Sequence, residues 1–155
     1  MPQLSFHSPL GELTVSEENG QIVSVDWGWA PGNSPTPLLK RAKTQFDQYF
    51  DGTRIGFDLP LAPAGTPFQR KVWCALEKIP YGRTTTYGAL ATRLKSAPRA
   101  VGAACGANPI PIIIPCHRVF GADGKLHGYS GGEGLATKAH LMRLEGFEIQ
   151  TSLPL

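Results

Sequence analysis

A cysteine, a histidine and an arginine stand together as Cys116, His117 and Arg118, directly after the apolar and proline-rich segment 110–115. A cysteine is a good nucleophile only as its thiolate, and an unperturbed thiol, with a pKa of about 8.5, is ionised to only a few per cent at neutral pH. A neighbouring histidine can remove the proton, and an acid can orient that histidine. Cys116 is therefore the candidate nucleophile and His117 the candidate base.

Glu145 is the candidate acid. The apolar spacing over residues 133–147 predicts a helix closed by Gly146, and Glu145 stands in its last turn. A carboxylate there faces the negative end of the helix dipole, at a cost of a few tenths of a kcal/mol or more. We expect it either to be fully solvated or to be held by a positive or hydrogen-donating group, and His117 is the candidate.

The segment before the candidate nucleophile, residues 108–114, is predicted to be a buried β-branched strand that ends at Pro115. Neighbours on an extended strand point to opposite sides, so His117 can reach the Cys116 thiol only through a chain reversal or a bridging water. Pro115 favours a sharp turn at this place. A buried cysteine beside a surface histidine is the alternative interpretation.

The other two cysteines, Cys74 and Cys105, are predicted to be small buried packing residues. None of the three cysteines lies in a CxxC or other metal-ligand spacing, and free thiols are typical of a reducing cytoplasm. The sequence has no basic segment leading into an apolar signal core and no apolar run long enough to span a membrane. We expect a cytoplasmic protein with no membrane contact.

Charge is segregated along the 155 residues. Residues 1–60 contain four Lys or Arg and seven Asp or Glu, whereas residues 61–155 contain eleven and five. Between residues 78 and 122 there are six cations and no acid. This pattern is typical of a face that binds a polyanion such as a nucleic acid, and a merely solvated basic face is the alternative.

The elements around these residues predict an α+β fold in two parts. Residues 3–27 alternate between short apolar segments and turn-forming residues, which predicts antiparallel strands joined by hairpins. Residues 36–50 have the spacing of an amphipathic helix. The proline-punctuated segment 56–66 is the expected linker, so we place a small amino-terminal sheet-plus-helix domain at residues 1–60 and a mainly helical domain at residues 61–155.

Two short helices are predicted in the second part, over residues 86–94 and 99–107, joined by a tight turn. This is the layout of a helix-turn-helix. Apart from Val101, the second helix is built of Gly, Ala and Cys from Ala100 onward, so its backbone could approach another surface closely. That surface could be a nucleic-acid groove or the core of the protein itself.

Four segments together resemble the family of methylated-DNA–protein-cysteine methyltransferases, also called O6-alkylguanine-DNA alkyltransferases. They follow in the family's order and spacing within residues 66–147: TTYGAL (85–90), RAVGAACGANPIPIIIPCHRV (99–119), GYSGG (128–132) and LEG (144–146). The PCHR tetrapeptide after an apolar segment, with RAVG and NP before it, is highly specific. Residues 1–60 match the family only in general character.

The resemblance implies DNA repair: a flipped O6-alkylguanine loses its alkyl group to Cys116 in a single-use reaction, with O4-alkylthymine as a second candidate substrate. It implies that His117 activates the thiol through a water and that Glu145 holds His117. Tyr87 would rotate the phosphate of the flipped nucleotide and donate a proton to the leaving base.

Further roles follow from the same resemblance. Arg99 would fill the gap left by the flipped base, and the helix with Ala100 and Gly102 would enter the minor groove. Asn108 would tie the helix-turn-helix to the active-site strand. Three more residues would line the base pocket: Val119, Tyr129 and Ser130.

Duplex DNA with alkylated guanine is the expected partner of a monomer. No cofactor or metal is expected, because relatives that hold zinc in the amino-terminal domain use Cys and His there, and this chain offers His7 and no cysteine. Two other functions stay open. One is a non-catalytic sensor of alkyl lesions; the other is a Cys-His-Glu acyl hydrolase, which would turn over and leaves Arg99 unexplained.

Overall fold

The structure is a computed structural model that describes residues 1–121 and 134–147 and divides into two compact units. Unit 1 consists of residues 1–64 and 109–113, and unit 2 begins at residue 65 and takes up the rest of the chain. The predicted α+β class is confirmed, since unit 1 holds an antiparallel sheet and unit 2 is mainly helical. In the described ranges no helix is long and apolar enough to cross a membrane.

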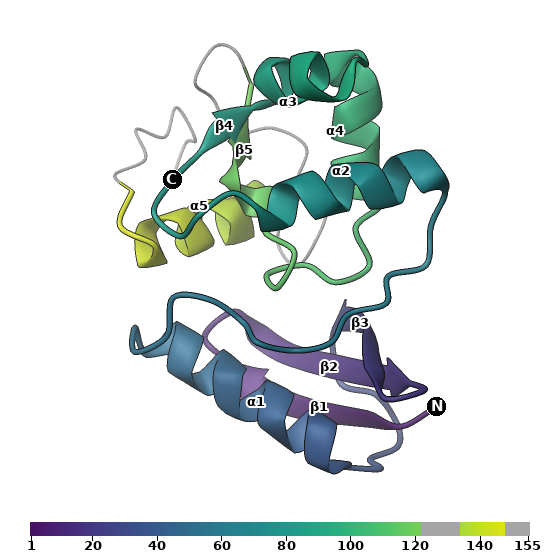
Figure 1. Cartoon of the computed structure of the whole chain (residues 1–155). Coiled ribbons are helices and arrows are strands. Elements are labelled where there is room, and N and C mark those ends of the chain that lie inside the picture. Colours follow the sequence, from purple (N-terminus) through teal and green to yellow (C-terminus); the bar gives the residue numbers. More distant parts are fainter. Residues whose placement is uncertain (122–133, 148–155) are drawn as a thin grey trace. The chain divides into compact units, whose positions relative to one another are not determined.

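Unit 1 begins with the predicted antiparallel strands: β1 (Gln3–Ser8), β2 (Gly11–Glu18) and β3 (Gln21–Trp27), in the order β1-β2-β3 (Figure 1). Asn19 and Gly20 join β2 to β3 with φ angles of 53° and 76°. Positive φ at both central residues matches the twist of the two strands, which is why Asn-Gly favours this turn.

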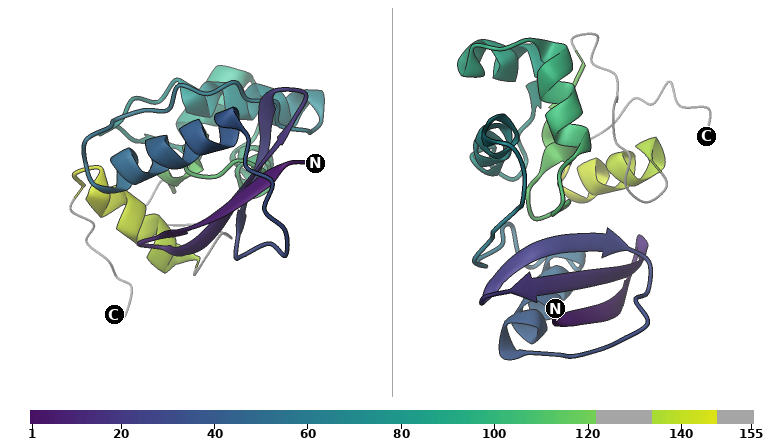
Figure 2. Two further views of the ribbon diagram at one scale, coloured as in Figure 1. Left: turned by 90° about the horizontal axis from the view of Figure 1, so that it is seen from below. Right: turned by 90° about the vertical axis from the view of Figure 1, so that its right-hand side faces the viewer.

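Helix α1 (Pro37–Phe50) packs on one face of this sheet (Figure 2). Thr36 caps the helix, because its hydroxyl accepts a hydrogen bond from the Leu39 amide at 3.1 Å. The ring of Phe46 packs against that of Phe6 of β1 at a tilt of 43°, with 5.3 Å between ring centroids. The apolar face read from the sequence thus forms the core of unit 1.

The segment expected to be a linker is partly paired with the sheet. Ile22 of β3 donates its amide to the Pro60 carbonyl, and the Ala62 amide donates to the Ile22 carbonyl, both at 2.8 Å. The amide of Val25 donates to the Pro109 carbonyl at 2.9 Å. Residues 109–113 therefore belong to unit 1, although the chain on either side of them belongs to unit 2.

The strand predicted over residues 108–114 is wrong. The four isoleucines of this segment are buried as expected, but the chain turns, and Ile112 has a φ of 74°. Pro109 and Pro111 have no amide to donate to a sheet, so an apolar run that they interrupt cannot form a regular central strand. Burial was readable from composition, whereas the backbone path was not.

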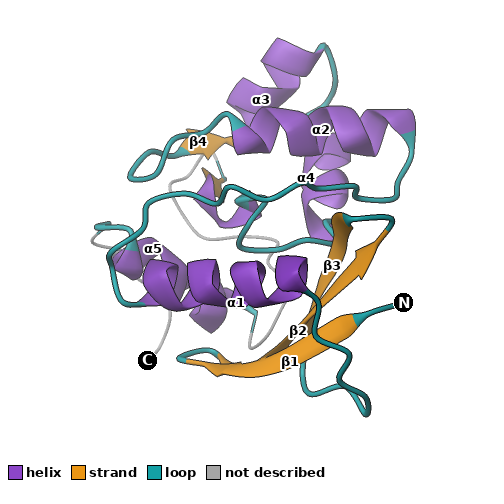
Figure 3. Cartoon of the chain, turned by 60° about the horizontal axis from the view of Figure 1, so that its bottom comes forward, coloured by secondary structure: helices purple, strands orange, loops and turns teal. Residues whose placement is uncertain are grey.

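Unit 2 contains four described helices and a short parallel pair of strands (Figure 3). The helices are α2 (Pro67–Glu77), α3 (Tyr87–Leu94), α4 (Pro98–Gly106) and α5 (Leu135–Leu144). The strands are β4 (Thr85–Thr86) and β5 (Val119–Phe120), and β5 follows directly on a 3-10 turn, η1 (Cys116–Arg118).

The predicted helix-turn-helix layout is confirmed by α3 and α4. Three residues join the two helices, and the first of them, Lys95, takes the left-handed conformation with a φ of 54°. Both helices contact α2. The indole of Trp73 on α2 donates a hydrogen bond to the Ala104 carbonyl of α4 at 2.8 Å, which fixes α4 to the rest of unit 2.

Cys74 is exposed, so the prediction that it is buried is wrong, whereas Cys105 is buried as predicted. Helix α2 buries Val72, Trp73 and Leu76. Each helical residue advances by about 100°, which places Cys74 about 200° round from Val72, on the opposite face.

Trp73→Phe is expected to lower the free energy of unfolding by about 1.5–3 kcal/mol, because the variant loses a buried hydrogen bond and leaves a cavity. Trp29→Phe is the matched control, since Trp29 is 51% exposed, and we expect a change within about 0.5 kcal/mol. Urea unfolding of the whole chain measures both. Equal losses in the two variants would contradict the anchoring role of Trp73.

Candidate active site

The turn around Pro115 places the candidate nucleophile and base. Pro115 has φ −83° and ψ 65°, and the Cys116 amide donates to the Ile114 carbonyl at 2.8 Å, which together make an inverse γ-turn. The Arg118 amide then donates to the Pro115 carbonyl at 3.1 Å. The chain reversal predicted here is confirmed. Cys116, His117 and Arg118 lie in one 3-10 turn, so their side chains do not alternate between opposite sides as on an extended strand. Cys116 is 7% exposed and His117 is fully buried.

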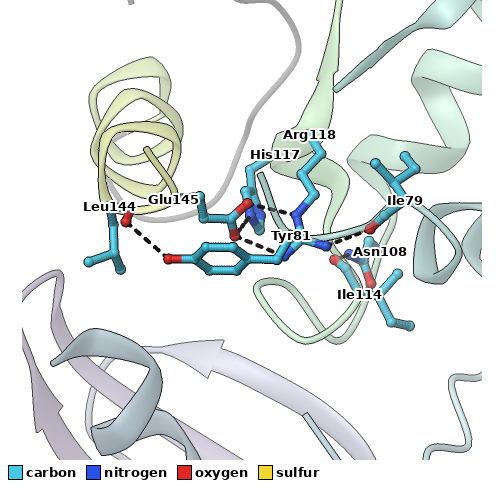
Figure 4. Close-up of polar contacts among 8 residues, drawn as sticks. All are labelled: Ile79, Tyr81, Asn108, Ile114, His117, Arg118, Leu144 and Glu145. Atoms are coloured by element: carbon cyan, nitrogen blue, oxygen red, sulfur yellow. Dashed lines mark hydrogen bonds and ion pairs between the residues drawn. The ribbon is translucent and has the colours of Figure 1, made fainter. Parts of the chain in front are cut away.

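Glu145 accepts hydrogen bonds from two residues of this turn (Figure 4). Nε2 of His117 lies 2.7 Å from Oε2 of Glu145. Nε of Arg118 donates to Oε1 at 2.7 Å, and its Nη2 donates to Oε2 at 3.0 Å. The expectation that a positive or hydrogen-donating group holds Glu145 is confirmed, although the arginine was not foreseen.

The end of α5 fixes where Glu145 stands. Gly146 has a φ of 98°, its amide donates to the Arg143 carbonyl, and the Phe147 amide donates to the Met142 carbonyl, both at 3.0 Å. This pair of bonds is a Schellman motif, which ends a helix at a defined residue. The hydroxyl of Tyr81 donates to the Leu144 carbonyl at 3.1 Å and holds the helix end from outside (Figure 4).

Burial lowers the pKa of His117, and the hydrogen bond and charge of Glu145 oppose this by raising it. A carboxylate can only accept, so Nε2 carries the imidazole proton of the neutral ring. Nδ1 is then an acceptor, and it is buried with no hydrogen-bond partner in the described part of the chain. In the neutral imidazole, Nδ1 is therefore the atom that can accept a proton.

Burial raises the pKa of Cys116, while a hydrogen bond from Asn108 and the charge of Lys138 lower it. The resting form is therefore the thiol, and its proton has to be removed for attack. Asn108 follows α4 and also donates to the Ile114 carbonyl at 2.9 Å. It thus connects the end of α4 to the turn that holds Cys116.

Comparison with known proteins identifies the family. Residues 67–147 match the model described as 6-O-methylguanine DNA methyltransferase, DNA binding domain. Residues 4–63 match the model described as 6-O-methylguanine DNA methyltransferase, ribonuclease-like domain. The chain belongs to the 6-O-methylguanine DNA methyltransferase family. The family resemblance inferred from the four sequence segments, including PCHR, is confirmed.

Curated and solved relatives cover nearly the whole chain. A methylated-DNA–protein-cysteine methyltransferase of Methanosarcina barkeri is 53% identical over 150 residues, which are 90% of this chain and 94% of the relative. The constitutive enzyme of that name from Bacillus subtilis is 44% identical over 151 residues, 89% and 91% of the two chains. The structure of Mycobacterium tuberculosis OGT in complex with DNA matches with a TM-score of 0.84 and 41% identity, covering 94% and 92%.

Tyr87, expected in the methyltransferase site from the resemblance, is the first residue of α3 and lies beside Lys138. The two side chains are 3.4 Å apart from Oη to Nζ. Burial raises the pKa of Tyr87, and Cys105 and Cys116 raise it further. The phenol therefore stays protonated at neutral pH and can act as a donor.

Lys138 is a site residue that the sequence analysis missed. It is fully buried on α5, and its Nζ donates to the Val119 carbonyl at 2.5 Å. Burial lowers its pKa to about 8, against the opposing effect of Cys116 and Cys105. The signal in the sequence was its spacing, since Lys138 stands three residues after Leu135 and four before Met142, on the apolar face of the helix.

The remaining residues expected in a methyltransferase site fall into three places. Val119 is buried in β5, where it pairs with Thr85 of β4. Arg99 is exposed as the second residue of α4, and Ala100 and Gly102 follow it, half-buried. Two pocket residues lie outside the described residues: Tyr129 and Ser130. Over the described ranges, no three His, Cys, Asp or Glu side chains are grouped to hold a metal ion.

Proposed function

We propose that this chain repairs DNA by moving the alkyl group of O6-alkylguanine onto the sulfur of Cys116, once per molecule. The curated relatives are named for methyl transfer from DNA to a protein cysteine, and a solved relative is bound to DNA. The observation that carries the assignment to Cys116 is its place in one buried turn with His117, whose Nε2 is held by Glu145 and whose Nδ1 is left as an acceptor.

The reaction begins when the Cys116 thiol gives its proton to Nδ1 of His117, through a bridging water. The thiolate sulfur attacks the alkyl carbon in line, the carbon–oxygen bond breaks, and its electron pair passes to guanine. Tyr87 donates a proton to the leaving base. It can do so because the raised pKa of its phenol keeps the hydroxyl protonated at neutral pH. The product is a thioether with no carbonyl for water to attack, so each molecule reacts once.

DNA binding in this proposal uses the helix-turn-helix of unit 2. A base in the stack cannot be reached by a side chain, and flipping it costs a few kcal/mol, which phosphate contacts of a basic face help to offset. Arg99 fills the gap in the duplex, and α4 with Ala100 and Gly102 enters the minor groove. Three residues line the pocket of the flipped base: Val119, Tyr129 and Ser130.

The rest of the proposal concerns the whole chain. Asn108 positions the Cys116 turn through its bond to the Ile114 carbonyl. Residues 1–60 act as a support domain, and residues 61–155 bind DNA and accept the alkyl group. The protein works as a monomer in the cytoplasm, and O4-alkylthymine is its second candidate substrate.

Intact-mass spectrometry after mixing the protein with equimolar duplex DNA that carries one O6-methylguanine tests the proposal. We expect a gain of one methyl group per molecule, confined to the peptide with Cys116. Lesion-selective binding without a gain would mean a sensor instead. If the protein neither gains a methyl group nor binds the lesion, the acyl hydrolase is favoured. Turnover of an ester substrate would then be the positive sign for the hydrolase.

Arg99→Ala is expected to slow transfer from duplex DNA by about tenfold or more, equivalent to about 1.4 kcal/mol of lost support for the flipped state. Transfer from a free alkylated base should change little, because no base has to be flipped. Single-turnover rates with both substrates measure the effect. Arg41→Ala is the control, as Arg41 makes a surface ion pair with Asp58 in unit 1. Equal slowing of Arg99→Ala on both substrates would contradict the proposal that Arg99 fills the gap left by the flipped base.

A further inference from the structure

We propose that Arg118 is a positioning residue that keeps the buried pair of His117 and Glu145 one proton short, so that Nδ1 of His117 can accept the Cys116 proton. The inference rests on the proposed function, because it takes His117 as the base of alkyl transfer. It assigns the third residue of the Cys-His-Arg turn a task of its own.

Arg118 is held on three sides by groups from other elements. Its Nε and Nη2 donate to the two oxygens of Glu145, at the end of α5. Its Nη1 donates to the Ile79 carbonyl, just beyond α2, at 2.7 Å. The guanidinium also lies over the Tyr81 ring, 5.8 Å from the centroid (Figure 4). A guanidinium is always charged and its donors form a rigid fork, so this arrangement fixes one positive charge against Glu145.

The charged and titratable groups that face His117 come from two elements. Glu145 at the end of α5 lies 2.7 Å from Nε2, and Lys138 lies on the same helix. Arg118 and Cys116 flank His117 in η1. Nη2 of Arg118 and Nε2 of His117 bind the same oxygen of Glu145, which puts the guanidinium within the range where one charge shifts the pKa of another group.

Arg118 balances the Glu145 charge without supplying a proton. Isolated charges in a buried site are costly, and a neutral pair of carboxylate and guanidinium needs no further compensation. The imidazole can therefore stay neutral beside the carboxylate. Burial, Arg118 and Lys138 all act to lower the pKa of His117, against the effect of Glu145.

Without Arg118, the buried carboxylate would be compensated by uptake of a proton from solvent. One proton already lies between Nε2 of His117 and Oε2 of Glu145, and the two groups titrate as a pair. Imidazole is more basic than a carboxylate, so the added proton would occupy Nδ1. Because Nδ1 is the proposed acceptor of the thiol proton, its occupation would stop the reaction until the pH is raised.

The test is the pH dependence of single-turnover alkyl transfer in Arg118→Gln and Arg118→Lys, at saturating protein with an O6-methylguanine duplex. The acid limb of the wild-type rate reports loss of the base. In Arg118→Gln we expect this limb to move up by about one to two pH units, with the rate recovering at higher pH. Arg118→Lys keeps the charge, so its limb should stay near that of the wild type.

Arg143→Gln is the matched control, since it removes an exposed arginine from the last turn of α5 and should leave the limb in place. If Arg118→Gln lowers the transfer rate by the same factor at every pH, without moving the acid limb, Arg118 is only a structural residue. A shift of equal size in both Arg118 variants would also overturn the role of its charge.

A second measurement needs only the wild-type protein, so it tests the inference even if the Arg118 variants do not fold. In nitrogen-15 spectra of wild-type protein, His117 should be neutral at pH 7 with its proton on Nε2, and an imidazolium at that pH would overturn the inference. Failure of the proposed function would look different, because wild-type Cys116 would then gain no methyl group at any pH.

Discussion

Cys116→Ala is expected to abolish alkyl transfer: the mass of the protein should not change after incubation with O6-methylguanine DNA, at any time or pH. The variant has no sulfur at the place where His117 can take a proton, and no other described thiol shares that turn. Removing a small, nearly buried side chain should leave lesion-selective binding intact. Peptide mapping and a gel-shift assay measure the two properties separately.

The other cysteines provide matched controls for this prediction. Cys105→Ala should transfer the methyl group, because burial raises the pKa of the Cys105 thiol to about 12 and keeps it protonated. Cys74→Ala should also transfer it, since Cys74 lies on the exposed face of α2. A methyl group found on Cys105 or Cys74 would contradict the assignment of Cys116.

Glu145→Gln is expected to lower the free energy of unfolding by about 3–5 kcal/mol, because it leaves the buried Arg118 guanidinium without its carboxylate. This corresponds to a fall in melting temperature of about 10 °C or more. The variant should also lose most of its transfer activity, since His117 is no longer held by an ionised acceptor. Urea unfolding and the methyl-transfer assay measure the two losses.

A double variant separates charge from packing. Arg118→Met combined with Glu145→Gln removes both buried charges, so it should recover much of the lost stability without recovering activity. A single Glu145→Gln variant as stable as the wild type would contradict the buried ion pair. Recovery of activity in the double variant would contradict the roles of both residues.

The family, the candidate nucleophile and base, and most of the helices and strands could be predicted from the sequence. The hairpins of residues 3–27, the helix over residues 36–50 and the turn at Pro115 were all predicted from it. Each depends on backbone preferences and hydrogen bonds between residues at most a few positions apart. Apolar periodicity likewise placed the core face of α1, since a helix presents the same face every three or four residues.

Which distant groups share the buried site could not be predicted from the sequence, because it depends on how the whole chain folds. Arg118 meets Glu145 across 27 residues of sequence and the Ile79 carbonyl across 39, and no local pattern encodes either contact. Lys138 is buried because the carbonyl of Val119 and the hydroxyl of Tyr87 receive it. Prolines turned the apolar segment 108–114 away from the expected strand. Charge compensation in a buried site is a property of the assembled fold, so the task of Arg118 became visible only there.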